Sequence, residues 1–136
     1  MKAYMKVFIL VVSALLFSCS DSEDELNLPA FEGTYEGTFT VEYLERGDTF
    51  TNPVMVTFNN GTYASTSGPN RTPAGGSGKF EMGTNSVTFD DENFWTADFD
   101  WNLILSGEYS VTETESKIIL TSRVDNVAVY TYELMK

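Results

Sequence analysis

The stretch TYEGTFTVEYL, residues 34–44, alternates between apolar and polar side chains with a period of two. Tyr35, Gly37, Phe39, Val41 and Tyr43 share one face, and threonine and glutamate side chains occupy most of the other. This period is typical of a β-strand that has one dry and one solvated face. We therefore predict a strand here, and the chain that follows continues with the same periodicity.

The alternation, interrupted by turn-forming residues, predicts seven more strands. Asn60-Gly61 is typical of a tight hairpin, because both residues accept the positive φ that such a turn requires. Pro53 cannot donate a hydrogen bond to a neighbouring strand, so we expect a bulge or a strand start there. Trp101 begins a long predicted strand, in which Gly107 predicts a sharp bend. The seven strands cover residues 49–58, 62–66, 77–82, 86–90, 101–112, 117–124 and 127–135.

Eight strands joined mostly by short turns predict an antiparallel up-and-down meander. An open meander has two exposed edges, whereas closure into a barrel removes both. We therefore predict an all-β chain with one small barrel domain at residues 33–136. A two-sheet β-sandwich is the alternative, with residues 67–76 and 91–100 as the connections long enough to cross between sheets.

The first part of the chain has the features of a secretory signal peptide. Lys2 and Lys6 precede an apolar run at residues 7–17. This run is too short to cross the ~30 Å of a bilayer as a helix, which needs about 20 residues. The sequence LFSC at residues 16–19 resembles the lipobox of bacterial lipoproteins, and that resemblance implies cleavage after residue 18 and a lipid on Cys19.

An acidic segment follows the cysteine. Residues 21–25 resemble the export signal of surface lipoproteins in Bacteroidetes. The two resemblances together imply a signal peptide at residues 1–18, a lipidated Cys19 with an acidic tether over residues 19–32, and attachment to the outer membrane through the lipid. They imply the cell surface as the location, with the periplasmic face as the alternative.

Short motifs in the strand region resemble those of the calycin superfamily, which comprises lipocalins and avidin-like barrels. These motifs are GTYEG at residues 33–37, Trp101 followed by GEY at residues 107–109, and a terminal hairpin. Small lipocalin-like surface lipoproteins of Bacteroidetes are the nearest type. The resemblance implies an eight-stranded barrel, which has room for packed side chains or one small ligand. Tyr35 stands where lipocalins carry tryptophan, and the sequence assigns no basic residue to pack on its ring.

Composition argues against several classes of function. The net charge is −12 with eight Lys and Arg residues, which does not suit nucleic acid binding. The chain has no histidine and a single cysteine, which removes Ser-His and Cys-His catalytic systems and common zinc sites. The acidic connection at residues 90–100 lacks the spacing of a calcium loop, and we interpret it as solvated. We therefore expect that the protein is not an enzyme and that it binds neither a cofactor nor a metal.

The same connection carries four candidate ligand-binding residues, Phe94, Trp95, Phe99 and Trp101. Aromatic rings beside carboxylates suit sugar recognition, but they also suit a hydrophobic plug, which a barrel end needs. Tyr35 and Tyr109 are further candidates, because strand-face aromatics either fill a core or line a cavity. The sequence thus predicts a non-enzymatic protein that binds a small apolar or glycan ligand in the barrel or at its mouth. The alternative is a structural or protein-interaction module with a filled barrel.

Overall fold

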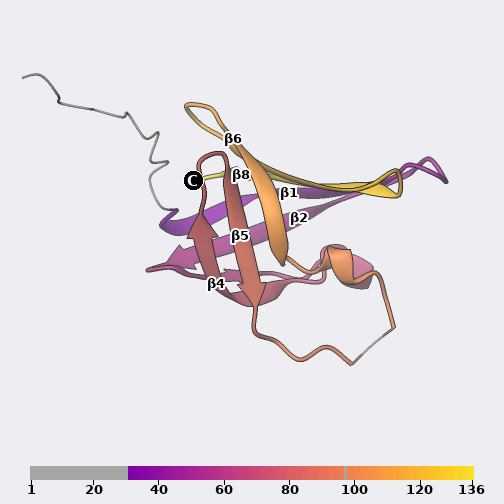
Figure 1. Cartoon of the computed structure of the whole chain (residues 1–136), viewed down its shortest axis with the longest axis horizontal. Coiled ribbons are helices and arrows are strands. Elements are labelled where there is room, and N and C mark those ends of the chain that lie inside the picture. Colours follow the sequence, from indigo (N-terminus) through magenta and orange to yellow (C-terminus); the bar gives the residue numbers. More distant parts are fainter. Residues whose placement is uncertain (1–30, 97) are drawn as a thin grey trace, which may run out of the picture.

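The computed structural model describes residues 31–96 and 98–136, which form a closed β-barrel of eight antiparallel strands (Figure 1). Each strand pairs with the next one along the chain, and β8 pairs with β1 to close the barrel. The up-and-down barrel predicted from the sequence is therefore confirmed, and the sandwich alternative is wrong. The strands are β1 (Gly33–Tyr43), β2 (Asp48–Asn59), β3 (Thr62–Ser65), β4 (Gly76–Met82), β5 (Ser86–Asp91), β6 (Gly107–Glu113), β7 (Ile118–Val124) and β8 (Ala128–Met135).

The predicted signal peptide, the lipidation at Cys19 and the tether up to residue 30 lie outside the described residues. The last apolar residue of the predicted tether, Phe31, is described and belongs to the core. Its ring packs against Phe58 at a centroid distance of 5.1 Å and against Phe80 at 6.3 Å. In the part of the chain that the structure describes, no helix is long and apolar enough to cross a membrane.

Strand β1 has the alternation that the sequence predicts, with the side chains of Tyr35, Phe39 and Val41 buried. Its register with β2 runs without interruption from Gly33 opposite Phe58 to Tyr43 opposite Asp48. The hairpin turn between β2 and β3 also follows the prediction, because Asn60 and Gly61 both have positive φ, 48° and 79°.

The bulge or strand start predicted at Pro53 is wrong, because Pro53 lies inside β2 and pairs with Thr38 in the unbroken register. The backbone nitrogen of Met55 donates to Thr66 Oγ1 on the side away from β1. Alternate residues of a strand point their nitrogens the same way, so the nitrogen of Pro53 also points away from β1. Strand β3 pairs with β2 only from Val56 onward, so the missing donor of Pro53 interrupts no ladder.

The predicted strand 101–112 is wrong in its first half. Trp101–Leu103 forms a short 3-10 helix, η3, and β6 begins only at Gly107, whose φ is 86°. Leu103, Ile104 and Leu105 are buried one after another instead of alternating.

Hydrogen bonds to the loop between β3 and β4 explain this local structure. Ala74 N donates to Leu103 O, and Leu105 N donates to Gly75 O, both at 2.8 Å. These bonds align residues 103–105 with the other loop, which also holds the 3-10 helix η2 (Pro69–Arg71). The partners are about 30 residues apart in the chain, so no local pattern predicts them.

Aromatic rings fill the barrel interior. Phe39 packs against Tyr132 at a centroid distance of 4.7 Å, and Tyr132 packs against Tyr109 at 5.8 Å. The hydroxyl of Tyr132 is buried and has no hydrogen-bond partner among the described residues, and burial raises its pKa well above the usual value. The most deeply buried large side chains are Tyr109, Tyr130, Tyr132, Phe39, Phe58, Phe89, Leu105, Leu120, Leu134, Val41, Val56 and Val87.

The two ends of the barrel differ because connections alternate between them in a meander. One end, called the turn end here, has the tight connections 60–61, 83–85 and 114–117, together with Phe31 and Lys136. The other, called the loop end, has the connections 44–47, 66–75, 92–106 and 125–127. The two long loops therefore lie at the end opposite to the one where the chain enters the barrel.

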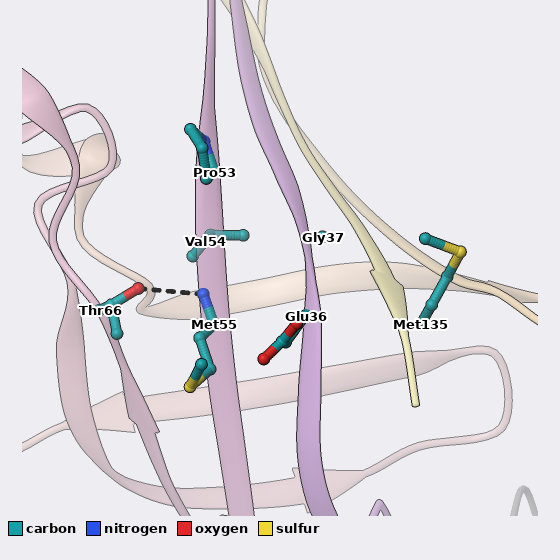
Figure 2. Close-up of a pocket in the computed structure, with 7 residues that line it drawn as sticks. All are labelled: Glu36, Gly37, Pro53, Val54, Met55, Thr66 and Met135. Carbon is teal, nitrogen blue, oxygen red and sulfur yellow. Dashed lines mark hydrogen bonds between the residues drawn. The ribbon is translucent and has the colours of Figure 1, made fainter.

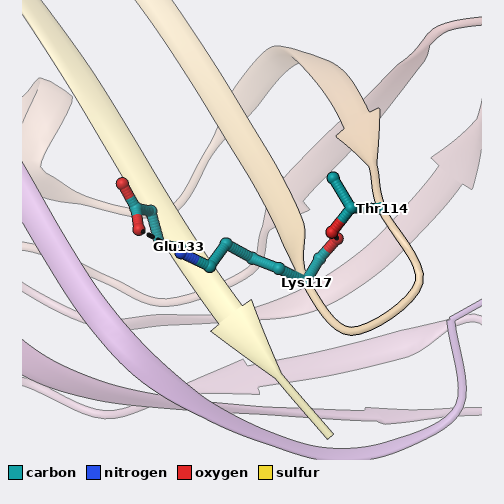
Figure 3. Close-up of polar contacts among 3 residues, drawn as sticks. All are labelled: Thr114, Lys117 and Glu133. Atoms are coloured by element: carbon teal, nitrogen blue, oxygen red, sulfur yellow. Dashed lines mark hydrogen bonds and ion pairs between the residues drawn. The ribbon is translucent and has the colours of Figure 1, made fainter.

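Side chains at the turn end make modest polar contacts. The ammonium of Lys136 lies 5.7 Å from the ring centroid of Tyr35, so this lysine is the basic partner that the sequence could not assign. Lys117 pairs with Glu133 at 3.0 Å, and Thr114 donates to the carbonyl of Lys117 across the β6–β7 turn (Figure 3). This ion pair is partly exposed, so it contributes little to stability.

Candidate functional site

The connection from β5 to β6 is fixed to the barrel at its start by Asp91. One carboxylate oxygen of Asp91 accepts hydrogen bonds from Ser77 N at 2.9 Å and Asn93 Nδ2 at 2.6 Å. The other accepts from Trp95 Nε1 at 2.5 Å. This carboxylate therefore determines the direction in which the loop leaves β5.

Asp100 fixes the far end of the same loop. Its Oδ2 accepts from the hydroxyls of Tyr43, at 3.0 Å, and Tyr130, at 2.7 Å. Its Oδ1 accepts from the backbone nitrogen and the side-chain amide of Asn102, both at 3.0 Å. Four donors occupy the acceptor positions of one carboxylate, so Asp100 joins β1, β8 and η3 into one polar cluster.

The cluster keeps its tyrosines protonated. Burial, followed by the hydrogen bond to Asp100, raises the pKa of Tyr43 to about 12. The same two causes raise the pKa of Tyr130. Asp91 and Asp100 are thus hydrogen-bonded structural acceptors, so the expectation of a solvated acidic connection is wrong for these two residues. Within residues 31–96 and 98–136, no three potential metal-ligating side chains lie close together.

Two groups of aromatic side chains lie at the loop end and are together called the aromatic band here. It consists of Phe50, Tyr43, Trp101, Phe99 and Trp95. Tyr43 lies 6.3 Å from Phe50, Phe99 lies 6.4 Å from Trp101, and Trp95 lies 5.8 Å from Phe99, all between centroids. The bond from Tyr43 to Asp100 joins the two halves of the band. Trp101 is 57% exposed and Phe50 is 50% exposed, so the band offers ring surface to a ligand.

Four of the six candidate residues from the sequence lie in this region, and two do not. Trp95, Phe99 and Trp101 belong to the aromatic band, and Phe94, which precedes Trp95 in the chain, is 90% exposed. Tyr109 is a core residue between Phe89 and Tyr132.

Tyr35 is also a core residue, and it packs at the turn end against Phe31 and Phe58. The plug expected from the aromatic residues is built mainly by Leu103, Ile104 and Leu105 instead. Trp95 and Phe99 contribute to it only as partly buried side chains.

Two pockets meet at Tyr43. One has a volume of about 290 Å³, and its lining includes Phe50, Asn52 and Asn70. The other has a volume of about 270 Å³, and its lining includes Asp100 and Asn102. Sequence reasoning missed Tyr43, Phe50, Asn52 and Asn102 as site residues. The sequence feature that could have identified them is their position near strand ends and turns, because residues there can face the mouth of a barrel.

A third depression, of about 530 Å³, lies on the outer wall over β8, β1 and β2 (Figure 2). Met55, Met135 and Pro53 provide its apolar surface, and Glu36 provides a carboxylate. The depression is wide open and has no aromatic ring in its lining. A specific small-molecule site needs convergent polar groups in a concave surface, and the pockets at the loop end meet that requirement better.

The fold and the site define an eight-stranded up-and-down β-barrel protein with a filled interior and an aromatic, amide-lined loop end. No protein-family model, no curated protein and no solved structure matches this chain.

Proposed function

We propose that the chain is a non-enzymatic, lipocalin-like lipoprotein of the cell envelope that binds a carbohydrate at the loop end of a filled barrel. The observation that carries this proposal is the aromatic band, in which Tyr43 and Phe50 line two pockets at one end of the barrel and Trp101 follows Asp100, a lining residue of one of them. We therefore assign the proposed binding to the mouth, one of the two places that the sequence suggested.

The chemistry of the loop end suits a sugar. The apolar faces of sugar rings stack on aromatic side chains, and the hydroxyl groups of sugars pair with amides and carboxylates. The pockets combine the rings of Tyr43 and Phe50 with the side chains of Asn52, Asn70 and Asn102. A purely apolar ligand would leave the remaining hydrogen-bonding capacity of these amides unused, which is unfavourable.

The packed interior argues against a ligand inside the barrel. Phe39, Phe58, Phe89, Tyr109 and Tyr132 are each at most 2% exposed, and they occupy the volume that an internal ligand would need. The interior therefore supplies stability, whereas the loop end supplies the binding surface.

The path of the chain agrees with a surface-anchored binding module. Phe31 enters the barrel at the turn end, so a tether that carries lipid on Cys19 would attach there. The loop end would then face away from the membrane. The excess of acidic over basic residues would also keep the domain away from anionic head groups.

The alternative function is docking of a protein partner at the same end. The exposure of Phe94, 90% on a loop that Asp91 and Asp100 hold in place, favours this alternative. An exposed apolar ring is a typical anchor in protein interfaces. Phe94→Ala would weaken the binding of such a protein partner and leave glycan binding unchanged.

Trp101→Ala is expected to weaken carbohydrate binding about tenfold, or ~1.4 kcal/mol, because it removes the most exposed ring of the aromatic band. The measurement is affinity electrophoresis of the purified protein in native gels that contain xylan, glucomannan, mixed-linkage β-glucan or laminarin. We expect at least one polysaccharide to retard the wild-type protein.

Met135→Ala is the matched control, since Met135 is 51% exposed on β8 near the turn end. It is expected to migrate like the wild type. The proposal fails if none of the four polysaccharides retards the wild-type protein, or if Trp101→Ala is retarded as strongly as Met135→Ala.

A further inference from the structure

We propose that the loop end contains two adjacent sugar subsites separated by Tyr43, and that it takes at least two consecutive neutral sugar units. This inference rests on the proposed function and adds the length and the charge of the glycan that the site selects.

Tyr43 is the single residue that the linings of the two pockets have in common. A ligand that fills both pockets must therefore pass this residue. The volumes are similar, about 290 and 270 Å³, so neither pocket is a minor extension of the other. A single sugar unit fills one pocket, whereas a longer chain gains contacts in the second.

The ring of Tyr43 is held in a fixed orientation between the pockets. Its hydroxyl donates to Asp100 Oδ2 at 3.0 Å. The guanidinium of Arg46 lies 5.1 Å from the ring centroid, and Phe50 packs at 6.3 Å. A ring fixed by three contacts is pre-organised, which lowers the entropic cost of stacking against a ligand.

The described residues that line the pocket beside Phe50 are all uncharged. Asn52, Asn70 and Thr72 supply its polar atoms, and Asn52 Nδ2 donates to Thr72 O at 2.6 Å, which fixes that amide. Neutral amides and hydroxyls pair with the hydroxyl groups of a neutral sugar. They supply no positive charge to offset the desolvation of a carboxylate.

The pocket beside Asn102 contains two acidic residues, Glu45 and Asp100, and one basic residue, Arg46. Arg46 also lies 3.9 Å from Asp48, so its charge is shared with a further carboxylate. The chain as a whole carries a charge of −12. An anionic glycan would therefore be repelled on approach and would find no unshared cation in this pocket.

The test is isothermal titration calorimetry of the purified protein with four neutral series, xylo-, cello-, manno- and laminari-oligosaccharides of one to six units, and with tri-galacturonic acid as the anionic probe. In the series that binds, the dissociation constant is expected to fall at least tenfold between one unit and three. Tri-galacturonic acid is expected to bind at least tenfold more weakly than the neutral trimer.

Two variants examine the subsites separately. Tyr43→Ala removes the ring between the pockets, and Asn70→Ala removes an exposed amide of one pocket. Both are expected to lose most of the gain in affinity with chain length, whereas Met135→Ala retains it. Circular dichroism shows which variants are folded. If Tyr43→Ala does not fold, Asn70→Ala still decides the test.

Three results overturn the subsite inference while the proposed function stands, provided that a polysaccharide retards the protein in the gel. They are equal affinity for one unit and three, equal affinity for tri-galacturonic acid and the neutral trimer, and an unchanged length dependence in the folded variants. Absence of heat in every series, with no retardation by any polysaccharide, overturns both proposals.

Discussion

Replacing Phe58 with alanine is expected to lower the free energy of unfolding by about 3–5 kcal/mol. The side chain is 1% exposed, and its ring contacts Phe31 and Phe80 at 5.1 Å, Tyr35 at 5.5 Å and Phe89 at 6.3 Å between centroids. Truncation removes the buried apolar surface and leaves a cavity among four rings. Small domains have a total stability of about 5–15 kcal/mol, so this variant loses a large part of it.

Urea denaturation followed by far-UV circular dichroism measures this loss. Phe94→Ala is the matched control, because it makes the same chemical change at a side chain that is 90% exposed. Its free energy of unfolding is expected to lie within about 0.5 kcal/mol of the wild type. If Phe58→Ala were as stable as Phe94→Ala, the interior would not be the packed core described above.

Gly37→Ala is expected to destabilise the closure of the barrel. Gly37 lies opposite Leu134 in the pairing of β1 with β8. A Cβ atom added there would lie 1.7 Å from the backbone oxygen of Glu133, so the two strands would have to separate. Overpacking usually costs about 1–3 kcal/mol, and a clash with backbone places this variant at or above the upper end of that range.

The measurement combines thermal unfolding with amide hydrogen exchange of β1 and β8, which is expected to accelerate in Gly37→Ala. Gly83→Ala is the control, because the added Cβ would meet Ser86 Oγ, which can rotate away. Equal melting temperatures and equal exchange in the two variants would contradict the close approach of β8 to β1 at Gly37.

The architecture was predictable because the period of two determines which side chains face the core. In β1, the residues that the sequence placed on the dry face include the buried Tyr35, Phe39 and Val41. Turn chemistry was equally local, since Asn60 and Gly61 adopt the positive φ that their side chains permit. Closure followed from the cost of exposed edges, and the pairing of β8 with β1 agrees with that argument.

Features that depend on distant partners were not predictable. Residues 101–105 fit an alternating pattern, but Ala74 and Gly75 bind their backbone and bury three of them in succession. Whether the missing hydrogen-bond donor of Pro53 interrupts the sheet depends on where β3 stops pairing with β2. No local sequence pattern encodes that position.

The candidate site was predictable in part for the same reason. The aromatic residues of the connection after β5 were evident from composition, and Trp95, Phe99 and Trp101 do form one row. The other side of the site comes from β1 and β2, which meet this connection through the bond from Tyr43 to Asp100. Composition also could not separate Tyr109, which is buried in the core, from a ligand-binding aromatic residue.

The central claim is that the ligand binds outside a filled barrel, at the loop end. The most direct test is an NMR titration of the ¹⁵N-labelled protein with the oligosaccharide series that binds in calorimetry. We expect the largest amide shift changes at Tyr43, Phe50, Asn70 and Asn102, which line the two pockets. Changes concentrated instead at strand residues around the packed interior, or at the turns of the opposite end, would contradict it.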